Sequence, residues 1–274
     1  MKKIFLSLAL VVLSVSAFAQ LSATAISGSD GYFVGKASYD LSFIPGLTIA
    51  PNVSLVQYDG IADMYRFGLN VEAKVPLWDA VRVGARGGYT PKRNSYSNYF
   101  YEGYAKVNLE SLLFHVVELD NLTLGAGLRQ TEHKFYASPD YKLGETDGYV
   151  SLGATKGGFD GNVTYTKALH FSDTRQYPPY LLDVPGLTAV MVKPAGFLQY
   201  ALNANLGYTY KIVRPYASYT YLKIYDMTAT DNLAAGITAK VGIVAVNASV
   251  EWLDISNRNN ERQTFYSING GISF

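Results

Sequence analysis

Residues 62–75 read ADMYRFGLNVEAKV, and their side chains alternate between apolar and polar from one position to the next. Tyr65 and Phe67 fall on one side of this alternation, whereas Arg66 and Glu72 fall on the other. Successive side chains of a β-strand point to opposite faces of its sheet. The stretch therefore predicts a strand with one face suited to an apolar environment and one face suited to water.

The same period of two recurs from Gln20 to the end of the chain and predicts an all-β protein. We expect about fourteen antiparallel strands of the length that crosses a membrane at a tilt. Their approximate ranges are residues 20–28, 31–43, 47–58, 62–75, 78–91, 98–110, 121–133, 147–156, 159–171, 197–210, 212–225, 230–241, 243–254 and 263–274. Twelve or sixteen strands stay open, because residues 111–120 and 187–192 fit the pattern poorly.

The composition separates a membrane barrel from a soluble β-protein. The chain has 23 Tyr, 13 Phe and 25 Gly but only 16% charged residues, whereas soluble domains carry roughly 25%. Mean hydropathy is +0.05, yet no run after residue 19 reaches the ~20 apolar residues of a spanning helix. These features favour a transmembrane, up-and-down β-barrel. A net charge of +1 argues against a nucleic-acid partner, which requires a basic face.

The first residues have the pattern of a cleaved secretory signal. Lys2 and Lys3 precede an apolar stretch at 4–15, and Ala17-Phe18-Ala19 supplies the small residues of a cleavage site. We therefore expect residues 1–19 to be removed and residues 20–274 to form one barrel domain. The chain has no cysteine, which excludes disulfides and thiolate metal sites. We expect no metal and no cofactor.

The last ten residues read FYSINGGISF and end on an aromatic side chain. Tyr266, Ile268, Ile272 and Phe274 share one face of this strand. The arrangement resembles the terminal assembly signal of outer-membrane barrels. With the leader and the strand pattern, the chain resembles the general family of porin-like bacterial outer-membrane β-barrel proteins. The resemblance implies a Gram-negative outer membrane, contact with its lipid, and contact with the outer-membrane assembly machinery.

Connections between the expected strands alternate in length. Short turns are expected at 44–46, 76–77, 157–158, 211 and 242, whereas 92–97, 134–146, 172–196 and 255–262 are longer. In bacterial barrels the short turns are periplasmic and the long loops are outside. Both termini are therefore expected in the periplasm.

Charged residues on the polar faces of neighbouring strands predict a charged lumen. The lumen-lining candidates are Arg66, Glu72, Arg82, Arg86, Glu102, Lys106 and Glu110. Such groups either line a water-filled path and bias which ions enter it, or form a fixed network that plugs the barrel. An ~8-stranded barrel is filled by its side chains and 16–18 strands leave a channel. The leading hypothesis is a passive channel for small hydrophilic solutes, whose identity the sequence leaves unknown.

Two other functions stay open. His170-Phe171-Ser172 is similar to the His-x-Ser of the outer-membrane phospholipase and lipid A deacylase families, which suggests a lipid hydrolase. Those families continue with Asn and present the pair to lipid, whereas here Asp173 follows and the alternation points His170 inward. We therefore assign no catalytic residue and expect no enzyme. The third hypothesis is a surface-exposed structural or binding barrel that acts through its loops.

Overall fold

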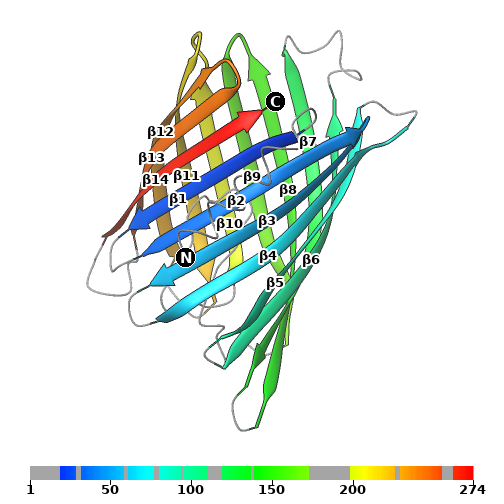
Figure 1. Cartoon of the computed structure of the whole chain (residues 1–274), viewed down its shortest axis with the longest axis vertical. Coiled ribbons are helices and arrows are strands. Elements are labelled where there is room, and N and C mark those ends of the chain that lie inside the picture. The colour runs from blue at the N-terminus through cyan, green and yellow to red at the C-terminus, as the bar shows by residue number, and fades with distance from the viewer. Residues whose placement is uncertain are drawn as a thin grey trace.

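A computed structural model of the chain describes residues 19–28, 32–58, 61–76, 80–93, 95–109, 119–136, 139–172, 198–225, 229–254 and 262–273. These residues form fourteen strands, all paired antiparallel, in one closed barrel (Figure 1). The predicted fold class is confirmed. The described residues contain no helix of the length and apolar character needed to cross a membrane. The expected leader, apart from Ala19, lies outside the described residues.

The strands follow one another around the barrel in chain order. They are β1 (Ala19–Gly28), β2 (Phe33–Ile44), β3 (Leu47–Tyr58), β4 (Ile61–Lys74), β5 (Val81–Arg93), β6 (Tyr96–Asn108), β7 (Asn121–Phe135), β8 (Tyr141–Lys156), β9 (Phe159–Phe171), β10 (Leu198–Tyr208), β11 (Val213–Ile224), β12 (Ala229–Val241), β13 (Val244–Asp254) and β14 (Arg262–Ser273). The first and last strands close the sheet along a register that runs from Gln20 opposite Ser273 to Gly28 opposite Phe265.

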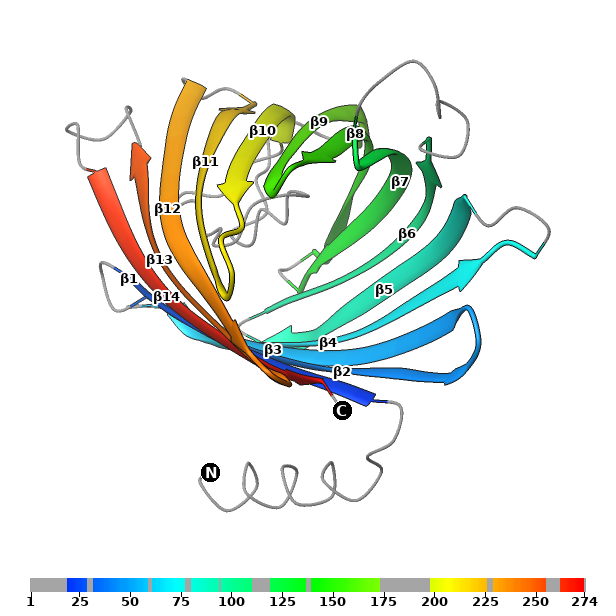
Figure 2. The same cartoon turned by 90° about the horizontal axis from the view of Figure 1, so that it is seen from above.

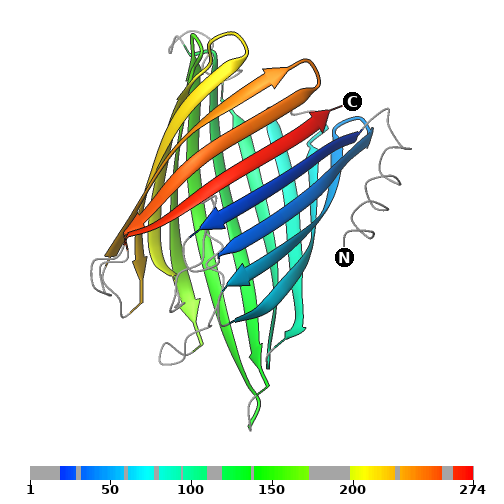
Figure 3. The same cartoon turned by 60° about the vertical axis from the view of Figure 1, so that its left-hand side comes forward.

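The two ends of the barrel differ. One end, here called the turn end, holds the start of β1, the end of β14 and the tight connections, and Figure 3 shows these strand ends together. At this end Gly157 and Gly158 link β8 to β9 with φ of +56° and +88°. Two positive φ angles in a two-residue hairpin suit the right-handed twist of the strands and favour glycine at both positions. The opposite end is called the loop end.

The outer surface carries the apolar half of the alternation. Large exposed apolar side chains cover it on all sides, among them Phe67, Leu128, Leu206, Tyr266 and Ile268, which are 53–65% exposed. The polar half faces the interior, which Figure 2 shows enclosed by a single layer of strands. The face assignment predicted from period two is therefore confirmed for the strand at 61–74, where Tyr65 is exposed outward and Arg66 lines an interior cavity.

One hairpin is longer than the sequence predicted. Strand β8 begins at Tyr141 instead of near 147, and β7 continues to Phe135, so the connection shrinks to residues 136–140. The rings of Phe135 and Tyr141 stack with centroids 4.6 Å apart and planes within 13°, which extends the pairing. The hairpin projects beyond its neighbours at the loop end (Figure 1). Residues 187–192 and most of 111–120 lie outside the described residues.

The outward and inward faces of one strand provide a matched test. Val150 of β8 is 53% exposed on the outer face, and the adjacent Ser151 faces the interior opposite Gly125. Near the membrane midplane an outward arginine costs about 2–4 kcal/mol, whereas an inward arginine meets polar groups. We expect Val150→Arg to lower the free energy of unfolding in lipid vesicles by about 2 kcal/mol or more. Ser151→Arg is the control, and equal losses from both variants would contradict the face assignment.

Candidate functional site

Glu72 is the centre of a solvated charge cluster inside the barrel. Arg82 Nη1 lies 3.1 Å from its Oε1, and Lys106 Nζ lies 2.8 Å from its Oε2. The side chains of Arg82 and Lys106 are 59% and 48% exposed although both point inward. The hydroxyl of Tyr104 is 3.1 Å from Glu72 Oε2. Exposed pairs of this kind contribute little to stability, so their charges act mainly on whatever occupies the lumen.

Glu102 forms a second, buried cluster. Its side chain has no exposed surface, and Arg86 Nε lies 2.7 Å from Oε2. Tyr149 donates its hydroxyl hydrogen to Oε1 over 2.9 Å, and Arg129 stands directly opposite on β7. A buried carboxylate is tolerated only when charged and hydrogen-bonding partners compensate its lost hydration. We interpret this cluster as a fixed part of the wall.

The predicted lumen residues therefore occupy three places. Glu72, Arg82 and Lys106 form the solvated cluster, and Arg86 and Glu102 form the buried one. Arg66 lies closer to the loop end, where its Nε donates to Thr90 Oγ1 over 3.3 Å. Its guanidinium carbon is 5.3 Å from the centre of the Phe100 ring. Glu110 lies outside the described residues. In the described part of the chain no group of His, Asp and Glu is arranged to hold a metal ion.

Several interior residues were missed by the sequence analysis. Arg129 alternates with Leu128 within a strand that the period did predict, and its guanidinium carbon lies 3.9 Å from the centre of the Phe100 ring. Glu145 belongs to the part of β8 that the sequence analysis assigned to a loop. Its Oε1 lies 3.4 Å from Nε2 of His133. Arg129 was recognisable from the alternation alone. Glu145 was not, because its strand starts among polar residues that resemble a loop.

Five interior aromatic side chains lie across the wall, each over a glycine directly opposite on the next strand. The pairs are Tyr104 with Gly84, Phe100 with Gly88, Tyr149 with Gly127, Tyr216 with Gly236, and Phe265 with Gly28. A Cβ atom at any of these glycines would come within 2.1–2.6 Å of the opposite side chain. Only glycine therefore leaves room for the ring against the sheet.

The tyrosine hydroxyls extend this arrangement to a third strand. Tyr149 crosses β7 to reach Glu102 on β6, and Tyr216 crosses β12 to reach Asn247 on β13, with hydrogen bonds of 2.9 and 3.1 Å. Tyr104 crosses β5 to lie 3.0 Å from Asn70 Oδ1 on β4. Because the rings run along the wall, they do not project toward the barrel axis. The interior keeps space that large side chains otherwise fill.

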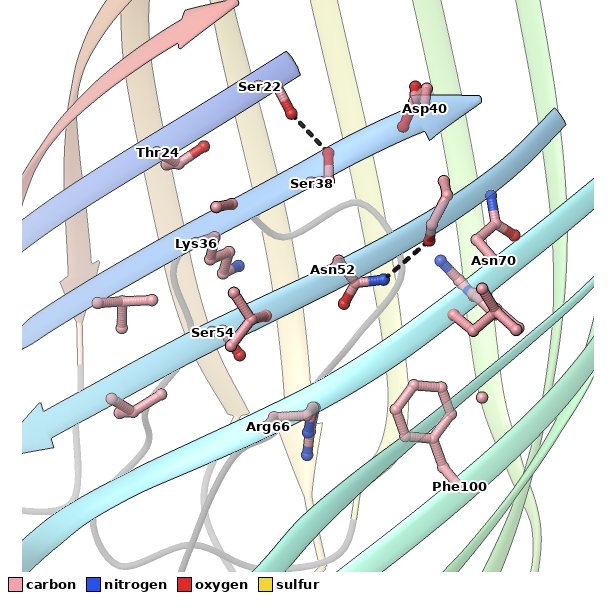
Figure 4. A pocket seen from close by; sticks show the side chains of 18 of the residues that line it. Ser22, Thr24, Lys36, Ser38, Asp40, Asn52, Ser54, Arg66, Asn70 and Phe100 are labelled. Atoms are coloured by element: carbon pink, nitrogen blue, oxygen red, sulfur yellow. Dashed lines mark hydrogen bonds between the residues drawn. The ribbon is translucent and has the colours of Figure 1, made fainter. Parts of the chain in front are cut away.

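A cavity of about 430 Å³ lies against the inner wall of β1–β6 (Figure 4). Six serine, threonine and asparagine residues line it together with Lys36, Asp40, Arg66 and Arg86, and apolar residues such as Val56 and Phe100 make up most of the rest. Its polar lining comes from the inward half of the alternation, as Ser22 opposite Ser38 shows with a 2.6 Å contact between the two hydroxyls. A volume of this size suits a small organic molecule.

Apolar side chains line the interior at the loop end. This apolar collar consists of Ile26, Val34, Val56, Met64, Tyr96, Phe135, Leu143, Leu198, Leu222, Ile224, Leu253 and Phe265, each at most 9% exposed. Two packed groups form within it, one around Ile26 and one around Tyr96, and Tyr225 packs against the second from the end of β11. The interior thus changes from apolar at the loop end to charged farther in.

The register corrects the predicted direction of His170. Thr146 pairs with His170 while Asp147 pairs with Ala168, so a bulge at Leu169 adds one residue to β9. Such a bulge reverses the facing of the residues beyond it, and His170 shares the outer face with Thr146. Ser172 Oγ accepts a 2.7 Å hydrogen bond from the Gly144 amide, and no hydrogen bond between His170 and Ser172 occurs in the described structure.

Comparison with protein-family models and with curated protein sequences finds no match. Among solved structures, Omp33 of Acinetobacter baumannii is similar with a TM-score of 0.50 at 13% identity, over 94% of this chain and 98% of that one. CdiB of the same organism also gives 0.50, at 12% identity over 92% of this chain, which spans 59% of CdiB. The CymD monoaromatic hydrocarbon channel gives 0.49 at 12% identity, over 94% of this chain and 89% of that one. The chain thus has the barrel fold of porin-like outer-membrane proteins, and the predicted resemblance is confirmed at that level.

The glycine beneath Tyr149 can be tested against another inward glycine. A Cβ at Gly127 would lie 2.6 Å from the Tyr149 ring, whereas a Cβ at Gly153 would have its nearest neighbour at 3.4 Å. Overpacking typically costs about 1–3 kcal/mol. We expect Gly127→Ala to lower the free energy of unfolding by at least about 1 kcal/mol, measured by denaturant titration in micelles. Gly153→Ala is expected to be neutral or slightly stabilising, and similar behaviour of the two variants would contradict the packing argument.

Proposed function

We propose that the protein is an outer-membrane channel that lets small hydrophilic solutes cross passively. The observation that supports this most is the exposure of Arg82 and Lys106, which point into the lumen and remain 59% and 48% accessible around Glu72. Charged groups stay solvated unless partners replace the lost water. Their exposure supports a hydrated interior at that level, which is close to the turn end.

The arrangement of the wall supports the same proposal. A fourteen-stranded barrel lies between small barrels that side chains fill and larger ones with a channel, at ~8 and 16–18 strands. Here the interior rings of Tyr104, Tyr149 and Tyr216 lie over glycines instead of entering the lumen. A fourteen-stranded barrel can be either filled or open, and this packing favours the open interior.

The apolar collar adds a barrier to this proposal. Its side chains are at most 9% exposed, so little of that layer is in contact with water. An apolar layer in a pore resists the passage of ions by excluding water. We therefore propose that the collar is the main barrier to ions along the path.

The other two hypotheses have less support. A hydrolase requires a base within reach of its nucleophile. Ser172 Oγ instead accepts a hydrogen bond from the Gly144 amide, and the described structure gives it no hydrogen bond to His170. The binding-barrel hypothesis rests on loops, and most residues of the longest connection, 172–197, lie outside the described residues. We retain the channel as the proposal and assign no catalytic residues.

Location and assembly belong to the same proposal. Tyr266 and Ile268 are 64% and 65% exposed on the outer face of β14, and Ile272 shares that face because it pairs with Val244. This apolar row is suited to contact with outer-membrane lipid and with the assembly machinery, and Phe274 lies outside the described residues. We propose that both termini are periplasmic, since the start of β1 and the end of β14 lie at the turn end.

Single cysteines test this orientation in a chain that has none of its own. Asp140 is exposed in the β7–β8 connection at the loop end, and Thr209 is exposed after β10 at the turn end. On intact cells an impermeant thiol reagent should label Asp140→Cys and leave Thr209→Cys unlabelled. Both variants should react after the cells are broken. The reverse labelling pattern on intact cells would contradict a periplasmic turn end.

Conductance in planar bilayers tests the channel itself. The wild-type protein should conduct, and Arg82→Ser should shift the reversal potential under a salt gradient toward cation preference, because Glu72 then keeps only Lys106. Arg82 is chosen over Arg86, whose removal strands the buried carboxylate of Glu102.

Lys142→Ser is the matched control. Lys142 forms a similar ion pair with Glu132 at 2.8 Å and is also 59% exposed. Both residues lie on the outer face, because they fall an even number of residues from the outward Leu128 of β7 and Val150 of β8. Its reversal potential should equal that of the wild type. Absence of any conductance would refute the channel, and an equal shift in the control would remove Arg82 from the conducting path.

A further inference from the structure

Lys36, Ser54 and Arg66 form one row across the inner wall of β2, β3 and β4. Ser54 pairs with Lys36 on one side and with Arg66 on the other, and all three residues line the cavity (Figure 4). We propose that this row binds the carboxylate of a small, hydroxylated organic anion, with the dimensions and chemistry of a sugar acid. The inference rests on the proposed function, in which such solutes enter the lumen.

The spacing of the row suits a carboxylate. Two strand separations place the Cα atoms of Lys36 and Arg66 about 10 Å apart, with the Ser54 hydroxyl between them. The Lys36 side chain is long enough to reach a group held over that hydroxyl, and the Arg66 side chain reaches it by turning away from β5. Charge-assisted hydrogen bonds from ammonium and guanidinium groups are the strongest that a carboxylate accepts.

Arg66 and Lys36 differ in their contacts. The Nε of Arg66 donates to Thr90 Oγ1 on β5 over 3.3 Å, and its guanidinium carbon is 5.3 Å from the centre of the Phe100 ring on β6. The side chain therefore leans toward β5 and β6, and a carboxylate over Ser54 exchanges the long hydrogen bond to Thr90 for stronger charge-assisted bonds. Lys36 is exposed, and the described structure gives it no hydrogen bond or ion pair.

The charge of the cavity fits a monoanion. Of the four charged residues in its lining, Arg86 is paired with Glu102. Lys36 adds an exposed positive charge, and Arg66 brings a second cationic group to the lining. Asp40 lies four residues from Lys36 along β2, about 13 Å away at the rise of an extended strand. Its negative charge, separate from the row, disfavours ligands with several negative charges.

The remaining lining combines polar and apolar residues. Ser22, Ser38 and Asn52 supply hydroxyl and amide groups, which both donate and accept hydrogen bonds, whereas Val34 and Phe100 supply apolar surface. The cavity volume of about 430 Å³ is in the range of small-ligand sites. A carboxylated sugar, which has hydroxyl groups as well as an apolar ring face, matches this mixed lining.

Titration calorimetry on the refolded, micelle-solubilised protein tests the site without requiring conduction. The probes are D-glucuronate and D-glucose, which share a ring and differ in the carboxylate. We expect glucuronate to bind at least about tenfold more tightly than glucose, because only glucuronate makes charge-assisted bonds. Lys36→Met and Arg66→Met should each weaken glucuronate binding about tenfold or more, while Lys36→Arg retains most of it.

Lys240→Met is the matched control, because Lys240 also faces the interior, opposite Ala245 on β13, but does not line the cavity. Equal binding of the two sugars would overturn the inference. An equal loss of glucuronate affinity in Lys36→Met and Lys240→Met would also overturn it, because binding would then depend on the total positive charge of the lumen and not on the row. Correct folding of each variant is checked by heat-modifiable migration. A protein that conducts salt without preferring glucuronate refutes only this inference, and one that binds glucuronate without conducting refutes only the channel.

Discussion

The structure depends on one constraint, which is that a sheet surrounded by lipid must leave no backbone polar group unpaired. Open sheet edges do not occur in the hydrocarbon region of a bilayer, so the sheet closes on itself. Here the closing seam is the pairing of β1 with β14. Once the sheet is closed, each strand has one face toward lipid and one toward the interior, and the alternation of residues such as Tyr65 and Arg66 has a single allowed direction. A slip of one residue would reverse both faces of a strand.

Closure also creates an interior that large side chains tend to fill. The pairing of aromatic residues with glycines keeps the rings against the wall and out of this space. A ring placed over a cross-strand glycine packs against the backbone and covers a position that otherwise weakens the sheet. The hydroxyl of Tyr149 then reaches the carboxylate of Glu102 two strands away. One side chain thus fills the space over Gly127, satisfies a buried charge and leaves the axis free. The strand register therefore determines both the hydrogen bonds among the interior polar groups and the space left in the lumen.

This dependence on register explains how much the sequence could predict. The strand count, most strand limits and the outward face followed from period two, because every strand obeys the same rule locally. The direction of His170 did not, because one extra residue at Leu169 reverses the alternation and nothing local marks the bulge. The partnership of Tyr149 with Gly127 was equally inaccessible, since it depends on how two strands align. The sequence could place Glu72 and Glu102 on the inner face, but burial, which separates their roles, depends on neighbouring strands.

The difference between those two glutamates bears on how lumen charge acts. Both have cationic partners within 3.1 Å, yet the Glu102 side chain is fully buried and that of Glu72 is 16% exposed. A buried pair at fixed geometry presents almost no net field to a solute, because its charges cancel over a short distance and its carboxylate cannot be approached. Around Glu72, two exposed cations share one carboxylate, so this cluster has an excess positive charge in contact with water. Lys36 is a further exposed cation on the inner wall. In the proposed channel, ion selectivity follows from which charges remain exposed, and that depends on where the tyrosines lie against the wall.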